Sequence, residues 1–570
     1  PDKAWSPESL YGNGKAAGIA VSLYGLRSGR NWGCGDFTDL RDFIDWTAEH
    51  LQAGFVALNP LHAIPNRQPY NTSPYLPTSM FYRNPLYLDV TKVEDFPRSR
   101  WAQRLLERKR VQDAISELRS AKYVEYEKVY ALKLPFLKLA FRAFLQEQRR
   151  SSPHAQEFHR YIDTEGELLH RFAVYCALDE IIHKRHPDIW IWPDWPEQYR
   201  DPESEAVSSF AHEHSRLVLF YKYIQWQVDL QLAAAQQHAK NRGLSIGLYH
   251  DLALATDRCG SDLWAHRPFY VSGCRVGSPP DDFSPSGQDW GFPPPNSVKH
   301  RDDGYQLFSA SIRKNARHGG ALRIDHVMRF FRLFWIPDGR SAVEGTYVKD
   351  YPDDLLRILA LESVRNRFIV IGEDLGTVEP AFREDLERFG ILSYRLLYFE
   401  KNSSGDFKLP QEYPRKALVS VSTHDLPTLA GFWTGRDIEA RRNAGLVDEA
   451  SYHQQRASRI EEKQKLLNLF FYLNLLPDWF PRIAAEIAEF TGELHYAAVG
   501  FLASTPSELM VLNQEDLFKD TDQQNLPGST EQYPNWRHKL RFTIEEMNAL
   551  REVEDYARMF RHWLERAGRL

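Results

Sequence analysis

Three short apolar segments of the chain each end beside an acidic side chain. The segments and the residues that follow them are Ala321–Ile324 with Asp325, Phe368–Gly372 with Glu373, and Ala417–Thr423 with His424 and Asp425. Short β-branched runs with polar ends are typical of buried parallel strands, and the C-terminal ends of such strands carry the chemistry of α/β folds. Carboxylates that converge on one mouth can cleave an acetal. The pattern therefore indicates a candidate site for chemistry on a glycosidic bond.

An acidic residue after a strand also often caps the helix that follows, so each acid taken alone has a structural explanation of similar weight. Two neighbouring residues favour a common site. Arg323 lies two residues before Asp325, and His424 directly precedes Asp425. Because side chains alternate with period two along a strand, Arg323 and Asp325 share one face, where the guanidinium can hold the carboxylate anionic.

Composition limits the class of partner. The chain has 570 residues and a net charge of −6, with Lys+Arg 71 against Asp+Glu 77, which disfavours nucleic acid and an anionic membrane surface. Hydrophobic residues make up 43%, enough for a large core. The 15 Trp, 27 Tyr and 33 Phe residues include side chains that can stack on sugar rings, although core packing explains most of them.

The four cysteines are far apart and match no C-x-x-C spacing, so neither a disulfide framework nor a structural zinc site is indicated. This pattern fits a reducing compartment, and we expect a cytoplasmic location. The sequence shows no signal peptide and no apolar run of about 18 residues that could cross a membrane. It begins at Pro1 without a methionine, so we expect a preceding segment to be missing.

Eight strand-like segments alternate with helical segments and predict a closed (β/α)8 barrel. They are residues 18–24, 55–61, 244–251, 321–324, 368–372, 393–399, 417–423 and 508–513. Large, mainly helical insertions separate strands 2 and 3 and strands 7 and 8, because these stretches are too long for a βα connection.

We expect five sections along the chain. Residues 1–85 begin the catalytic barrel, 86–240 form a helical insertion, 241–430 hold strands 3 to 7 and the site, 431–507 form a second helical insertion, and 508–570 supply the last strand and C-terminal helices. Two long loops rich in Pro or Gly, residues 64–75 and 277–291, are expected to contribute binding groups at the mouth of the barrel.

Several motifs resemble those of the amylomaltases, the 4-α-glucanotransferase or disproportionating-enzyme family of the α-amylase clan. They are Ala321–His326, Ile371–Gly376, Ser422–Pro427, Pro279–Asp281 with Gly287–Gly291, and Asn525–Ser529 with Pro534–Arg537. They occur in family order across most of the chain. The resemblance is to the longer bacterial type, whose members carry an N-terminal β-rich region that we expect this chain to lack.

The resemblance implies a retaining double displacement. Asp325 is then the nucleophile, Glu373 is the acid and base, and Asp425 steadies the transition state and binds sugar hydroxyls. For this chemistry, the surroundings must separate the pKa values of the nucleophile and the acid. The implied substrate-binding residues are Arg323, His424, Asp251, Asp281, Tyr75, Trp290, Gln288 and Asn525.

The implied partners are maltooligosaccharides and glucose, with no metal or organic cofactor. Two other functions remain open from the sequence. A retaining α-glucan hydrolase uses the same three acids, and the choice depends on acceptor binding and exclusion of water. A non-catalytic glucan-binding protein could keep the barrel, but the presence of all three acids disfavours it.

Overall fold

A closed barrel of eight parallel strands forms the centre of the computed structural model, which describes residues 1–67, 72–148, 152–280, 286–376 and 378–570. The strand order is β1-β14-β13-β12-β11-β8-β5-β2. The bounds are β1 (Ala16–Val21), β2 (Phe55–Leu58), β5 (Gly247–Leu252), β8 (Ala321–Ile324), β11 (Ile369–Gly372), β12 (Leu392–Leu396), β13 (Ala417–Ser420) and β14 (Leu509–Asn513). Each overlaps one predicted segment, so the predicted (β/α)8 barrel is confirmed.

Burial on both faces explains why these strands read as continuous apolar runs. Every residue of β2, β8, β11 and β13 is buried, because one face points into the barrel and the other packs under helices. A polar residue directly after such a strand is therefore the first residue that can lie outside the core. This places Asp325 and Glu373 at the rim of the barrel.

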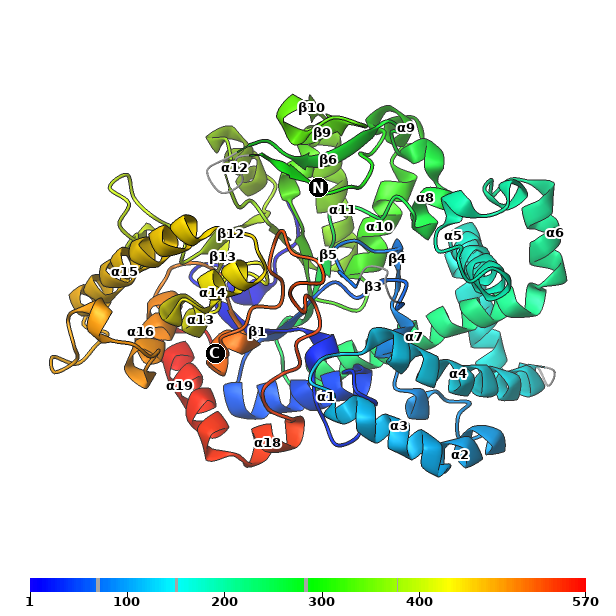
Figure 1. The fold of residues 1–570 in the computed structure, drawn as a ribbon, viewed down its shortest axis with the longest axis horizontal. Coiled ribbons are helices and arrows are strands. Elements are labelled where there is room, and N and C mark those ends of the chain that lie inside the picture. The colour runs from blue at the N-terminus through cyan, green and yellow to red at the C-terminus, as the bar shows by residue number, and fades with distance from the viewer. Residues whose placement is uncertain (68–71, 149–151, 281–285, 377) are drawn as a thin grey trace.

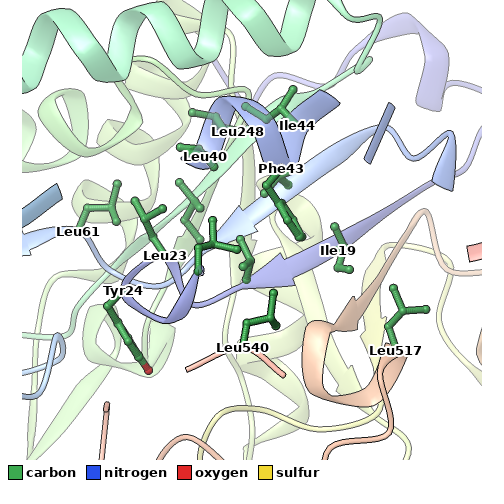
Figure 2. Packing of buried hydrophobic residues seen from close by; sticks show 14 of the residues in the cluster. Ile19, Leu23, Tyr24, Leu40, Phe43, Ile44, Leu61, Leu248, Leu517 and Leu540 are labelled. Carbon is green, nitrogen blue, oxygen red and sulfur yellow. The ribbon is translucent and has the colours of Figure 1, made fainter. Parts of the chain in front are cut away.

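The first helix shows how the sequence covers the barrel. Asp36 caps the N-terminus of helix α1 (Phe37–Trp46): its side chain accepts hydrogen bonds from the backbone N–H groups of Thr38 and Asp39, and it forms a capping box with Asp39. Its apolar face, with Leu40 and Phe43 fully buried, packs close to Ile19 of β1 (Figure 2). This helix lies between β1 and β2, in agreement with the predicted alternation of strands and helices.

Two groups of helices extend from opposite sides of the barrel in Figure 1. Between β2 and β5 come α2 (Arg100–Leu106), α3 (Lys109–Ser120), α4 (Tyr126–Gln148), α5 (Pro153–Arg185), α6 (Glu205–Glu213) and α7 (Ser215–Asn241), on the right. After β13 come α13 (Leu429–Thr434), α14 (Arg436–Asn443), α15 (Glu449–Tyr472) and α16 (Gly492–Ala503), on the left.

Short antiparallel strands outside the barrel were not predicted. The hairpin β3 (His62–Ala63) and β4 (Ser79–Arg83) follows β2. A second sheet, ordered β10-β9-β6-β7, contains β6 (Cys274–Ser278), β7 (Gln288–Asp289), β9 (Arg332–Pro337) and β10 (Thr346–Lys349). These strands were missed because they are short and because β6 and β7 flank a segment that reads as a Pro/Gly loop.

The remaining helices complete the outer layer. They are α8 (Ser261–Ala265), α9 (Ser297–Asp302), α10 (Gln306–Ala316), α11 (Pro352–Asn366), α12 (Pro380–Arg388), α17 (Gln514–Leu517), α18 (Ile544–Ala549) and α19 (Arg551–Ala567). Every helix in the described part of the chain is too short or too polar to span a lipid bilayer.

Candidate active site

The two central carboxylates follow neighbouring strands at the C-terminal end of the barrel. Asp325 comes directly after β8, and Glu373 comes directly after β11. The strands pair in parallel with Ile324 opposite Gly372, and the Glu373 N–H donates to the Ile324 carbonyl over 3.0 Å. The two acids therefore leave the barrel at the same level.

Arg323 connects these carboxylates to a third one. Its Nη1 atom lies 2.8 Å from each carboxylate oxygen of Asp251 on β5, and its Nη2 atom lies 3.1 Å from Asp325 Oδ1. The same Nη2 atom lies 4.0 Å from Glu373 Oε2, so these two oxygens of Asp325 and Glu373 are at most about 7 Å apart. This limit accommodates the separation of about 5 Å that retaining glycosidases use.

Tyr75 and His424 form a second wall beside Asp251. The Tyr75 hydroxyl donates to Asp251 Oδ2 over 2.6 Å and lies 3.2 Å from His424 Nδ1, and the two rings stack with centroids 4.4 Å apart. His424 Nε2 lies 3.4 Å from Asp425 Oδ2, while Asn525 Nδ2 donates to Asp425 Oδ1 over 2.6 Å. A continuous set of polar contacts therefore joins Asp251 to Asp425.

The surroundings of Glu373 favour its protonated form. Burial raises the pKa of Glu373 to about 7, and the negative charge of Asp325 adds to this rise. Arg323 and hydrogen bonds from the backbone N–H groups of His326 and Leu375 oppose it. A carboxyl group with a pKa near neutrality can both give and take a proton at working pH.

The other acids are in different environments. For Asp425, burial alone raises the pKa, but the charge and hydrogen bond of His424, the hydrogen bond of Asn525 and the charge of Arg323 together outweigh burial, and the pKa is lowered. The Asp425 side chain is 44% exposed and lines the cleft that lies above the barrel. Asp325 accepts hydrogen bonds from Arg323 and from the Leu254 N–H, interactions that suit a carboxylate anion. The surroundings thus act in opposite directions on two acids of the site: they raise the pKa of Glu373 and lower that of Asp425.

A cleft of about 1140 Å³ opens over the three acids Asp325, Glu373 and Asp425. Gln288 of the short strand β7 and Trp290, which follows that strand, line it, and the Trp290 indole N–H donates to Gln288 Oε1 over 3.1 Å. A smaller cavity of about 90 Å³ adjoins Asp251, Arg323 and Tyr75. The cleft is large enough for several sugar units.

The structure brings the predicted site residues together around these two cavities. Those described are Asp325, Glu373, Asp425, Arg323, His424, Asp251, Tyr75, Trp290, Gln288 and Asn525. Asp281 lies outside the described residues. The sequence did not indicate how closely Arg323 and Asp251 interact, because the two residues meet only through the pairing of β5 with β8.

Several cleft residues had no predicted role. Tyr123, which precedes α4, lines the cleft, as do Tyr533 and Trp536. The sequence motif Pro534–Arg537 contains Trp536, but the spacing of its residues alone assigns them no function. Only the structure shows that the Trp536 ring contacts Tyr75 and His424.

The fold and site define a class of protein. A (β/α)8 barrel that holds a buried acid with a raised pKa beside a second carboxylate, in a large cleft at the C-terminal end of its strands, is suited to an enzyme that acts on glycosidic bonds.

Comparisons with known proteins identify the family. The family described as 4-alpha-glucanotransferase matches residues 21–544, and the chain belongs to this family. A 4-alpha-glucanotransferase of Haemophilus influenzae is 36% identical over 95% of this chain and 77% of its own length. A 4-alpha-glucanotransferase of Mycobacterium tuberculosis is 37% identical over 95% of this chain and 73% of its own length.

Solved structures agree in fold. The amylomaltase of Corynebacterium glutamicum superposes with a TM-score of 0.85 at 29% identity, covering 98% of this chain and 77% of that one. An amylomaltase of Streptococcus agalactiae in complex with acarbose gives a TM-score of 0.77 at 18% identity, covering 97% and 99% of the two chains. The family match and the curated relatives confirm the predicted enzyme class, a 4-α-glucanotransferase.

Proposed function

We propose that this 4-α-glucanotransferase works by a retaining double displacement with Asp325 as nucleophile and Glu373 as acid and base. In the first step, an Asp325 oxygen bonds to the anomeric carbon, the bond from that carbon to the glycosidic oxygen breaks, and Glu373 protonates the departing oxygen. In the second step, an acceptor 4-hydroxyl gives its proton to Glu373 while its oxygen displaces Asp325. Two inversions retain the α configuration.

One observation carries this assignment. Within the cleft, Arg323 Nη2 lies 3.1 Å from Asp325 and 4.0 Å from Glu373, while burial raises the pKa of Glu373 to about 7. The guanidinium favours an anionic nucleophile, and burial favours a protonated acid. The two carboxyl groups can therefore divide the two roles at neutral pH.

The reacting sugar is proposed to lie between the two connected walls of the site. There Asp425 and His424, in the same wall as Tyr75, bind hydroxyl groups and stabilise the charged transition state, and Asp251 and Arg323 belong to the other wall. The remaining proposed substrate contacts are Trp290, Gln288 and Asn525 along the cleft, together with Asp281 on the ground of family resemblance.

The proposed substrates are maltooligosaccharides, with another glucan chain or glucose as acceptor. Incubation with maltotriose is expected to produce glucose and a ladder of longer maltooligosaccharides, because an acceptor bound in the cleft competes with water for the glycosyl-enzyme. Chromatography of the products and a reducing-end assay measure the outcome. The total of reducing ends should stay nearly constant.

The same assay separates the alternatives. An increase of one reducing end for every bond cleaved, with no ladder, indicates a retaining α-glucan hydrolase. Unchanged maltotriose that nevertheless binds indicates a non-catalytic glucan-binding protein. The raised pKa of Glu373 beside Asp325 argues for an enzyme, because a binding site gains nothing from a buried acid of this kind.

The setting of the enzyme is also a proposal. Cys34 and Cys274 carry free thiols, which supports a reducing compartment such as the cytoplasm. The net charge of −6 supports a neutral glucan as partner in place of nucleic acid. Residues 86–240 and 431–507 are proposed to be helical insertions of the catalytic barrel.

A further inference from the structure

We propose that Trp536 is a positioning residue that holds Tyr75 and His424 in place, and that helix α4 holds Trp536 through the Tyr126 hydroxyl. This inference rests on the proposed function, because Tyr75 and His424 affect the reaction only if they surround the reacting sugar. It assigns a task to a tryptophan that takes no part in the chemistry and to a helix from outside the barrel.

Three aromatic rings contact one another beside the site. The Trp536 ring centroid lies 5.4 Å from that of Tyr75 and 5.0 Å from that of His424, while Tyr75 and His424 stack at 4.4 Å. Trp536 is only 6% exposed. Its indole therefore fills the space beside the stacked pair, and removing it leaves a void into which either ring can turn.

Tyr75 and His424 each contact a carboxylate of the site. The Tyr75 hydroxyl donates to Asp251 over 2.6 Å, and His424 Nε2 lies 3.4 Å from Asp425. A polar contact weakens steeply with distance and angle, so rotation of the Tyr75 ring breaks its contact with Asp251, and rotation of the His424 ring breaks its contact with Asp425. Loss of the indole packing thus disturbs the groups on both sides of the reacting sugar without removing a charge.

The backbone of Trp536 has an unusual conformation that hydrogen bonds hold in place. Its φ angle is 61°, in the left-handed region that a bulky residue rarely adopts. Two hydrogen bonds hold it there: the Trp536 N–H donates to the Gln524 carbonyl over 2.9 Å, and the Trp536 carbonyl accepts from the Tyr126 hydroxyl over 2.6 Å. A strained conformation persists only where surrounding contacts fix it.

The segment of Trp536 is anchored to α4. Tyr126 is the first residue of α4 and is 3% exposed. Next to it, the Val124 N–H donates to the Arg537 carbonyl over 2.9 Å, and Arg537 donates to the Val124 carbonyl and to Glu125, each over 3.0 Å. The start of α4 and the segment of Trp536 are thus held together, and the helical insertion reaches the active site through them.

The test compares two replacements of the indole. Trp536→Leu is expected to lower kcat on maltotriose by about 10²-fold, the scale of an active site misplaced by about 1 Å. KM should change by less than about threefold, because the substrate contacts along the cleft remain. Trp536→Phe keeps an aromatic ring against Tyr75 and His424 and should recover most of the lost kcat.

A second pair of variants removes single oxygen atoms from α4. Tyr126→Phe deletes the donor to the Trp536 carbonyl and is expected to lower kcat by roughly threefold to tenfold, because that carbonyl loses its buried partner. Tyr130→Phe is the matched control one turn along the same helix and should keep the kcat of the unmodified enzyme. The melting temperature of each variant shows that it is folded.

The outcomes are distinguishable. Reduced kcat in Trp536→Leu and Tyr126→Phe, with recovery in Trp536→Phe and no effect in Tyr130→Phe, supports the inference. Unchanged kcat in folded Tyr126→Phe and Trp536→Leu overturns it, and so does a loss confined to KM, which makes Trp536 a binding residue. If the unmodified enzyme transfers no glucan from maltotriose, the proposed function fails instead.

Discussion

Replacement of Asp325 by asparagine is expected to lower kcat/KM for maltotriose by roughly 10³-fold or more. The amide has nearly the shape of the carboxylate, but it cannot form a stable bond to the anomeric carbon, so the first displacement stops. The interaction of Arg323 with Asp251 remains available to hold the site together. Initial rates of glucose release measure the change.

A matched control is available in the sheet next to the barrel. Asp338 also pairs with an arginine, since Arg275 Nη1 lies 2.9 Å from its Oδ1, but this pair belongs to the second sheet, outside the barrel, and the Asp338 side chain is 47% exposed. Asp338→Asn should therefore retain the rate of the unmodified enzyme. A folded Asp325→Asn variant with near-normal turnover would show that another group attacks the sugar.

Replacement of Glu373 by glutamine is expected to reduce turnover of maltotriose by a similar factor of roughly 10³. The glycosidic oxygen of maltotriose needs a proton as it departs, and an amide cannot supply one. An α-glycosyl fluoride needs no such proton, so the variant should release fluoride much faster than it cleaves maltotriose. Comparison of the two substrates measures the role of Glu373 as an acid.

The pH dependence of kcat/KM provides an independent test of the role of Glu373. Glu373 must be protonated in the free enzyme to start the reaction, and burial raises its pKa to about 7. Activity as kcat/KM should therefore be high below this pH and fall about tenfold per pH unit above it. In Glu373→Gln this alkaline fall should be absent. An unchanged fall in the variant would assign it to a different group.

Much of the barrel could be predicted because its strands are buried on both faces. Burial produces the uninterrupted apolar runs before Asp325 and Glu373, and the first polar residue after each run marks the strand end. Asp425 was harder to place from the sequence. The strand β13 ends at Ser420, and the family motif located the acid beyond it.

Other parts of the site depend on contacts between distant segments. The hydrogen bond from Tyr126 to Trp536 joins residues 410 positions apart, and no local pattern announces it. Similarly, Tyr75 reaches Asp251 from the loop between β3 and β4, and the short strand β7, which contains Gln288, has only two residues. Such features arise because loops pack against the folded barrel, and the hydrophobic periodicity of the sequence does not predict this packing.

Trapping the covalent intermediate tests the double displacement most directly. The Glu373→Gln variant, incubated with α-maltosyl fluoride and digested at low pH, should yield one modified peptide in which Asp325 carries a maltosyl group, as located by mass spectrometry. The ester accumulates because the amide that replaces the Glu373 carboxyl group cannot activate an acceptor. A maltosyl group on Asp425 or Asp251, or fluoride release without any modified carboxylate, would contradict the account.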